Sequence, residues 1–402
     1  WTPITPLTGS LLHADPQLYS DAWFVAEAYN LGPYSFLNTL PATRAGRMYD
    51  LKPGIVLRAE WLLVHEARVA METDDDHYHG GSAFDEMASL ASLVLDARIV
   101  AGPIDRTFTT GEDPLGRPRG HDTTLLPLLS TAIQRPQIPR LQGQRDLREL
   151  SEIVSYPSLP ADGAAALVKS ARLFQNALWI ADSAPETAWL LLVSAIETAA
   201  NHWDSDSRTP EERLALSYVS LINILRKAGV ENIIPKVART LKGVIGAESK
   251  FIGFMEAFMP PEPVERPTFG KVDFGAEAML ASIKRIYRLR SRALHSGIPF
   301  PAPMCLSPER YDDGPFQESP LGLATTTLGA SWKAEDTPML LHVFAYLTRG
   351  ALLNWWRGMP KSGIEPEDLA FCDRLTDFRS LAERFSGLDK DCVQSSQRGT
   401  GN

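Results

Sequence analysis

Two side chains capable of chemistry lie five positions apart in the stretch "LRSRALHSG", residues 289–297. A guanidinium such as that of Arg290 can bind an anion through its fork of N–H donors. An imidazole such as that of His295 can exchange protons, because its ordinary pKa lies near neutrality. The question is how the chain positions these two groups.

The apolar spacing predicts a helix over residues 277–295, with an apolar stripe that includes Ile283 and Ile286. Arg290 falls inside this stripe, whereas Arg288 and Arg292 project elsewhere and are typical of a solvated face. Gly297 and Pro299 end the helix. A position five residues on points about 140° away in a regular helix, although a frayed end would let His295 turn back toward Arg290.

A buried guanidinium requires a partner, because an unpaired buried charge costs several kcal/mol. Residues 187–201 form an apolar stretch that predicts a buried helix, and its acidic residue is Glu197. We therefore expect Glu197 to pair with Arg290. From spacing alone, two interpretations stay open: the pair fixes the register of two helices, or it belongs to a functional site.

The composition predicts a globular protein and excludes two classes. The chain has 402 residues, 44% hydrophobic residues and a net charge of −9, which argues against a protein that coats DNA. Its longest apolar runs are too short or too interrupted to span a bilayer. Three scattered cysteines predict neither a disulfide framework nor a zinc site, and favour a reducing, cytoplasmic environment.

The first 135 residues predict a small, mixed α/β domain. The pattern favours a short helix over 21–31, a strand leading into a helix over 54–71, and a helix running into a strand over 84–100. Prolines and charges over 136–160 indicate a linker.

Long helical patterns then dominate, so the fold class is mainly α, with a C-terminal helical bundle behind the small α/β domain. We expect the bundle to span 161–358, with an inserted loop at 298–335 and a final, central helix at 336–358. A single helix is predicted over 210–229. Residues 359–402 read as a C-terminal extension with a polar tail.

A second group of candidate residues lies between Asp74 and His79, in "DDDHYH". Carboxylates and imidazoles are metal ligands. Consecutive residues cannot all converge on one ion, and glycines follow, so the pattern favours an exposed polar loop over a metal site.

The stretch "LRSRALHSG" resembles the signature of the HEPN superfamily, whose motif is an arginine, a polar residue, variable positions and a histidine. Here these are Arg290, Ser291, residues 292–294 and His295. The "RS…HSG" form and "LLVSAIETAANHW" (191–203), with its Glu197, are similar to the Apea-like HEPN group. The resemblance covers about 160–358 and does not reach the N-terminal part.

This resemblance implies an HEPN-like bundle that acts as a metal-independent endoribonuclease without cofactor. The family's sites form where two motif helices meet in a homodimer. By carry-over, His295 would transfer protons, Arg290 would hold the scissile phosphate, Ser291 would bind or orient it, and Glu197 would position the site. Attack by the 2′-OH makes RNA the substrate.

Arg288 and Arg292 could guide the RNA backbone, although a solvated helix face is the simpler interpretation. The resemblance further implies a toxin–antitoxin or anti-phage defence role, with an antitoxin or defence protein as partner. The alternative function is a non-catalytic HEPN-like module for protein interaction or RNA binding. A third possibility places a metal-dependent activity around residues 74–79.

Overall fold

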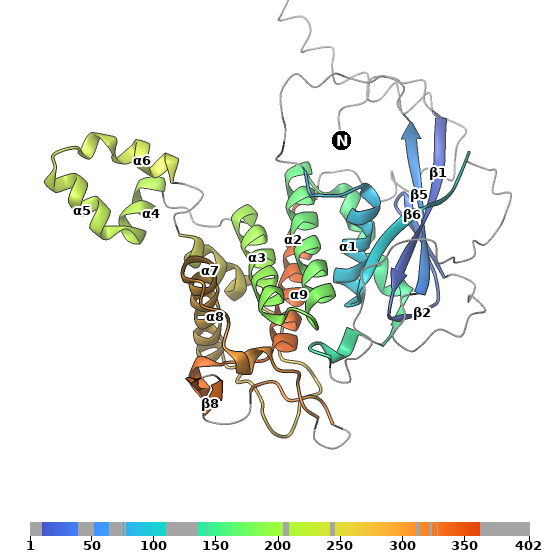
Figure 1. The fold of residues 1–402 in the computed structure, drawn as a ribbon. Helices are drawn as coiled ribbons and strands as arrows, with labels where there is room; N and C mark the ends of the chain where they lie inside the picture. Colours follow the sequence, from blue (N-terminus) through green and yellow to red (C-terminus); the bar gives the residue numbers. More distant parts are fainter. Residues whose placement is uncertain are drawn as a thin grey trace, which may run out of the picture.

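The computed structural model describes residues 10–38, 52–63, 75, 78–109, 136–141, 143–203, 209–241, 246–310, 314–320, 324–327 and 329–361. The described part is mainly helical with a strand-rich N-terminal region, as the sequence predicts. Figure 1 shows the strands on one side and the long helices on the other, with helix α1 between them.

Among the described residues, five antiparallel strands form the N-terminal sheet, in the spatial order β3-β4-β5-β1-β6. They are β1 (Ser10–Ser20), β3 (Ala28–Leu31), β4 (Tyr34–Asn38), β5 (Lys52–Leu63) and β6 (Ile99–Thr109). Antiparallel strands commonly cover a core with one face. Here that core contains Leu18, Phe36, Ile55 and Leu57, none of which is exposed.

The helix predicted over 21–31 is wrong. This stretch forms β2 (Trp23–Val25) and β3 instead. Ala26 and Asn30 adopt positive φ angles of 59° and 57°, which a right-handed helix cannot contain. β2 pairs with a distant segment, residues 144–146, whereas β3 forms a hairpin with the neighbouring β4. Strand pairing therefore decides the conformation of both, and local apolar spacing does not reveal it.

Helix α1 (Ala83–Leu95) joins the sheet to the bundle. It begins with a capping box, in which Ser82 and Asp85 satisfy each other's backbone N–H groups. Every residue from 87 to 95 is buried. A helix that is buried all round must be covered on both sides, and Figure 1 shows α1 between the sheet and the long helices. The predicted helix-then-strand over 84–100 is confirmed.

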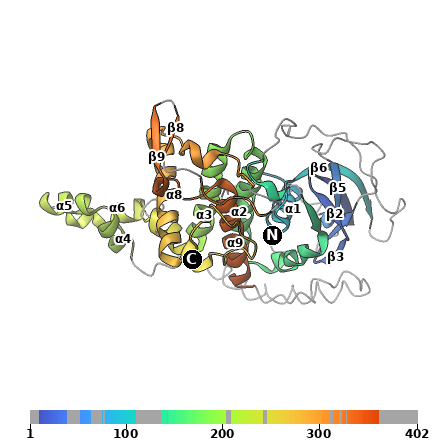
Figure 2. The same cartoon turned by 90° about the horizontal axis from the view of Figure 1, so that it is seen from below.

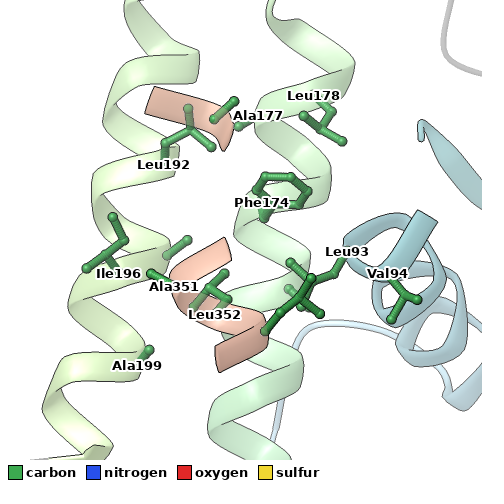
Figure 3. Packing of buried hydrophobic residues seen from close by; sticks show 14 of the residues in the cluster. Leu93, Val94, Phe174, Ala177, Leu178, Leu192, Ile196, Ala199, Ala351 and Leu352 are labelled. Atoms are coloured by element: carbon green, nitrogen blue, oxygen red, sulfur yellow. The ribbon is translucent and has the colours of Figure 1, made fainter. Parts of the chain in front are cut away.

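In the described part of the chain, five long helices form the bundle: α2 (Ala161–Ile180), α3 (Pro185–Trp203), α7 (Ala247–Phe258), α8 (Ala276–Ser296) and α9 (Leu341–Gly358). Apolar side chains from α1, α2, α3 and α9 interdigitate in one core, which Figure 3 shows around Phe174, Ile196 and Leu352. Most of α9 is buried, so its prediction as a central helix is confirmed.

The segment 136–160, predicted as a connector with one short helical piece, is packed into the fold where the structure describes it. Residues 136–141 and 143–160 form η1 (Pro139–Leu141), β7 (Gln144–Asp146), which pairs with β2, and η2 (Leu147–Ser158). Leu141, Leu150 and Ile153 are fully buried. One hydrophobic core runs from the sheet into the bundle. Short 3₁₀ segments hid this packing, because their apolar spacing matches neither a regular helix nor a strand.

The helix predicted over 210–229 is broken at Tyr218, whose φ of −129° and ψ of 53° are not helical. The chain forms α4 (Pro210–Ser217), α5 (Val219–Lys227), η3 (Glu231–Ile233) and α6 (Ile234–Thr240). We call residues 209–241 the insertion lobe. It has a small core of its own, and Figures 1 and 2 show it projecting from the bundle beside α7.

The inserted segment at 298–335 is anchored to the bundle in its described part. It contains η4 (Ala302–Cys305), β8 (Ala324–Thr327), β9 (Ala330–Lys333) and η5 (Ala334–Asp336). The indole of Trp189 stacks on the rings of Phe300 and Phe344, with ring centroids 5.3 Å and 5.0 Å apart, respectively. The same indole donates a hydrogen bond to the carbonyl of Met304, at 3.3 Å.

Most of the predicted C-terminal extension lies outside the described residues, which end at Lys361. Met359, directly after α9, is buried against the core. In the part of the chain that is described, every helix is too short or too polar to cross a membrane.

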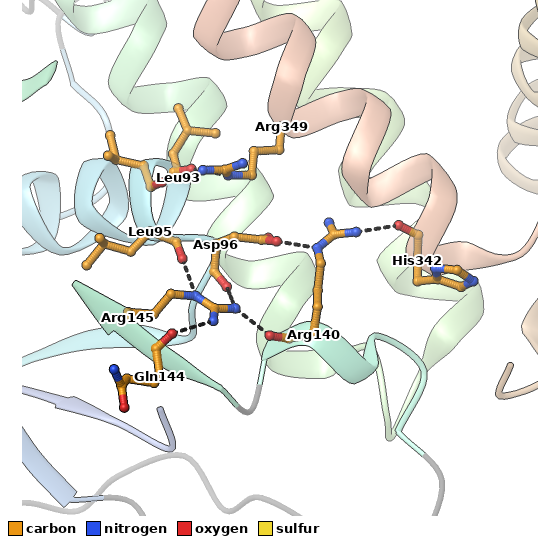
Figure 4. A network of polar contacts seen from close by, with 9 residues as sticks. Leu93, Leu95, Asp96, Arg140, Gln144, Arg145, His342 and Arg349 are labelled. Atoms are coloured by element: carbon orange, nitrogen blue, oxygen red, sulfur yellow. Dashed lines mark hydrogen bonds and ion pairs between the residues drawn. The ribbon is translucent and has the colours of Figure 1, made fainter. Parts of the chain in front are cut away.

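Arginine side chains from η1, β7 and α9 bind the C-terminal end of α1 and the residue after it (Figure 4). Arg349 donates to the carbonyl of Leu93, at 2.8 Å, and Arg145 donates to that of Leu95, at 2.6 Å. Arg140 pairs with Asp96 and donates to the carbonyl of His342, at 2.9 Å. Cations at a helix C-terminus satisfy its free carbonyls and complement its dipole. This network therefore ties the sheet region to the bundle.

His342 predicts a dependence of stability on pH. Burial lowers its pKa from 6.5 to about 4, and its Nε2 lies 2.8 Å from the Gln317 carbonyl. Between these two pKa values the unfolded chain binds the proton and the native chain does not, so acid favours unfolding. We expect the free energy of unfolding to fall by up to about 3 kcal/mol from pH 6.5 to pH 4 through this group.

Urea unfolding of the wild type and of His342→Gln across this range measures the effect. The glutamine can still donate to Gln317 but does not titrate, so its stability should decline less steeply below pH 6.5. Parallel pH profiles for the two proteins would contradict a buried neutral His342.

Candidate functional site

Helix α8 carries the arginine and the histidine in the predicted manner. It spans Ala276–Ser296, close to the predicted 277–295, and buries Ile283 and Ile286. Gly297 ends it with a left-handed φ of 63°, and its N–H donates to the carbonyl of Arg292. Glycine accepts this conformation without strain.

The predicted pair between Glu197 and Arg290 is confirmed. Arg290 Nη2 lies 2.5 Å from Glu197 Oε2, joining α8 to α3. The two side chains are only 19% and 14% exposed. At this burial the charges are poorly screened, so each depends on the other far more than a surface pair does.

Tyr287 completes this group, and the sequence analysis did not identify it. Its side chain lies beside Glu197, whose pKa it lowers, and the Arg290 guanidinium lies 5.9 Å from the centre of its ring. Burial raises the pKa of Tyr287 to about 12, so the phenol remains a donor at neutral pH. The available signal was its spacing, since residues three apart in a helix share a face.

Burial also sets the electrostatics of Glu197. It raises the pKa of this carboxyl above its ordinary value, while Arg290 and Tyr287 act in the opposite direction. The Nε of Arg290 is buried and has no acceptor in the part of the chain that is described. Because this Nε is sealed from solvent, an incoming anion must reach the guanidinium through the 19% of the side chain that stays exposed.

His295 and Ser291 are not joined to this pair within the chain. His295 is exposed in the last turn of α8, which stays helical through Ser296. A regular helix therefore places it about 140° around the axis from Arg290 and about 7.5 Å along it. Ser291 is half-buried. One chain brings together Glu197, Tyr287 and Arg290, and presents His295 separately to solvent.

Arg288 and Arg292 both lie on the exposed face, as predicted. Arg288 Nε lies 3.9 Å from Glu248 Oε1, at the start of α7. Both of these side chains are largely exposed, so the contact is weak.

The cluster around residues 74–79 gains no support as a metal site. Asp74, Asp76 and His77 lie outside the described residues. His79 Nε2 lies 3.3 Å from Glu86 Oε2, on α1. Among the described residues, no three metal-ligating side chains gather around one point.

The contact of His79 belongs to a second polar cluster that the sequence did not reveal. Tyr156, on η2, donates to Glu86 at 2.5 Å. Burial raises the pKa of Glu86. Burial, and to a smaller extent the negative charge of Glu86, raises the pKa of Tyr34 and that of Tyr156. These residues come from distant parts of the chain, so spacing gave no signal, and their contacts fasten η2 to α1.

A cavity of about 220 Å³ lies between η1, the proline-rich segment after α7 and α9. Its lining includes Arg140, Phe316 and Tyr346 but none of the predicted site residues. It is therefore separate from the candidate site on α8.

Comparison with known proteins gives no relative, since no family model, curated protein or solved structure matches the chain significantly.

The Glu197–Arg290 pair predicts a strong energetic coupling. Glu197→Gln leaves Arg290 half-buried without a counter-charge, and should lower the free energy of unfolding by about 2 kcal/mol. Arg290→Gln should act similarly. The double variant should lose less than the sum of the two, with a coupling of about 1–2 kcal/mol.

Chemical denaturation of the four proteins in this cycle measures that coupling. Arg292→Gln, on the exposed face of the same helix, is the matched control and should change stability by less than about 0.5 kcal/mol. Strictly additive losses would contradict an energetically important pair.

Proposed function

We propose that the protein is a metal-independent endoribonuclease whose active site forms between two copies of α8. The observation that carries this proposal is the ion pair of Arg290 with Glu197, on the helix whose end presents an exposed His295. The same three residues carry the resemblance to the Apea-like HEPN group. On this resemblance, the ion pair and the histidine belong to one active site.

In the proposed reaction the ribose 2′-OH attacks the adjacent phosphorus and the bond to the 5′-oxygen breaks. The products are a 2′,3′-cyclic phosphate and a 5′-hydroxyl. His295 accepts the proton of the 2′-OH or donates one to the leaving oxygen. Arg290 binds the phosphate oxygens as negative charge develops on them.

Glu197 and Tyr287 act as positioning residues for Arg290 in this scheme. Ser291 donates a hydrogen bond to the phosphate or orients the site. Arg288 and Arg292, exposed on the same helix, attract the RNA backbone.

A second copy of the chain is part of the proposal for a geometric reason. Arg290 and His295 of one helix lie on different faces. If two α8 ends meet, the histidine of one copy can lie near the arginine of the other. The exposed Leu294 and Ile298, at 52% and 44%, flank His295 and provide apolar surface for that contact.

A second candidate function is a non-catalytic interaction or RNA-binding module. It is favoured by the closeness of Glu197 to Arg290, which would also suit a purely architectural pair. The two functions differ in what His295 does: the module needs no exposed imidazole.

For the nuclease we further propose a role in toxin–antitoxin or anti-phage defence, with an antitoxin or defence protein as partner. Such a setting follows from the family resemblance, and it would require the activity to be silenced until needed.

Cleavage of RNA in the presence of EDTA tests the proposal. We expect the wild type to cut RNA, to leave a 2′,3′-cyclic phosphate, and to spare a substrate with 2′-deoxyribose at the cut. His295→Ala should lower the rate by about 10²–10⁴-fold, as expected for loss of a general acid or base. Since His295 is exposed, this variant should unfold at the wild-type temperature.

Lys271→Ala, which removes a charge from an exposed position outside α8, is the control and should retain most of the activity. A wild type as inert as His295→Ala on every RNA tried would favour the interaction module. Cleavage that survives in His295→Ala at the full rate would place the chemistry elsewhere.

A further inference from the structure

The insertion lobe holds very little core for its size. Among its described side chains, those that are apolar and fully or nearly fully buried are Leu214, Ile222 and Ala238. Most residues of α5 and α6 are exposed. A core this small gives only marginal stability. The insertion therefore contributes mainly exposed surface to the molecule.

That surface is basic in an acidic protein. Residues 209–241 contain five basic and three acidic residues, a net charge of +2, whereas the whole chain carries −9. Arg226 and Lys227 end α5, and Lys236 and Arg239 lie on α6; all four are exposed. Within the described residues no carboxylate lies within 4.0 Å of these four cations.

The lobe is attached beside the candidate site. It leaves the bundle after Trp203, the last residue of α3, which also carries Glu197 six positions earlier. It rejoins at α7, whose first turn contains Glu248, the contact of Arg288. Both attachments therefore lie near the end of α8 that carries Arg288 and Arg290.

We infer that the insertion lobe is a docking surface for single-stranded RNA and feeds the strand to the site on α8. This inference rests on the proposed function and names how its substrate is held. The net negative charge of the chain repels a polyanion, so attraction must come from cations without local counter-charges. The lobe supplies four of them, together with the exposed ring of Tyr218, on which a base can stack.

The exposed Val219 and Ile224 would also suit a protein partner or a second copy of the chain. Phosphate binding is favoured because each of these apolar residues lies on a helix that ends in Arg226 and Lys227, and α6 adds Lys236 and Arg239. A protein partner is the competing outcome of the test.

Fluorescence anisotropy with a labelled single-stranded RNA of about 20 nucleotides measures the docking, in the full chain with His295→Ala to prevent cleavage. Each double variant, Arg226→Gln/Lys227→Gln and Lys236→Gln/Arg239→Gln, should weaken binding about tenfold at low salt. Each lost phosphate contact should also reduce the slope of log K against log salt by about 0.7. In the cleaving protein these variants should raise KM and leave kcat near the wild-type value.

The matched control is Lys271→Gln/Lys361→Gln, which removes the same charge from exposed positions outside the lobe. It should change RNA affinity less than about twofold. Lobe and control variants with the same affinity and salt slope would overturn the docking surface, even if the protein cleaves RNA. Conversely, RNA binding that depends on the lobe in a chain that never cleaves would leave the lobe assignment standing and remove the nuclease.

Ile224→Ser separates the competing outcome. Docking through phosphates predicts a small effect on RNA affinity and no change in oligomeric mass. A shift in mass by light scattering, with RNA binding indifferent to the four cations, would make the lobe a protein contact and overturn the inference.

Discussion

The guanidinium of Arg290, on the apolar face of α8, constrains how this end of the bundle packs. Arg290 is accommodated there because Glu197, on α3, forms an ion pair with it. Tyr287, in the preceding turn of α8, packs beside both residues. The three groups fix the register of α3 against α8, since moving either helix by one turn would leave a half-buried charge unpaired. The end of α8, and with it His295, is thereby held in place.

A second set of arginines determines how the N-terminal sheet is joined to the bundle. Arg145 and Arg349 satisfy carbonyls at the end of α1, and Arg140 bridges Asp96 to α9. Burial in this network lowers the pKa of Arg349, whereas the arginines hold the pKa of Asp96 below its usual value. The sheet and the bundle therefore share one core and one polar network, which makes the N-terminal part a structural component of the whole.

The sequence predicted best where a regular period runs through a long element. The stripe on α8, the all-round apolar character of α3 and α9, and the lone acid at Glu197 were sufficient to predict the ion pair. It failed where tertiary contacts decide. The strand at 23–25 depends on the distant β7, and the strand at 28–31 depends on its hairpin with β4. The packed segments η1 and η2 follow a 3₁₀ period, and Tyr218 breaks a helix that its neighbours favour. Glu86 was missed because its partners His79 and Tyr156 lie outside its own helix, whereas Tyr287 gave a signal through its spacing of three from Arg290.

The geometry of a guanidinium makes the close Glu197–Arg290 pair compatible with a role in binding phosphate. Only Nη2 of Arg290 is engaged by Glu197, and 19% of the arginine side chain stays exposed. Five N–H donors allow a carboxylate on one side and a phosphate on another. Burial raises the pKa of Glu197, so a second anion near Arg290 would favour protonation of this carboxyl further. Under the proposed function, Glu197 can then take up a proton when the substrate phosphate binds, while Arg290 stays in place.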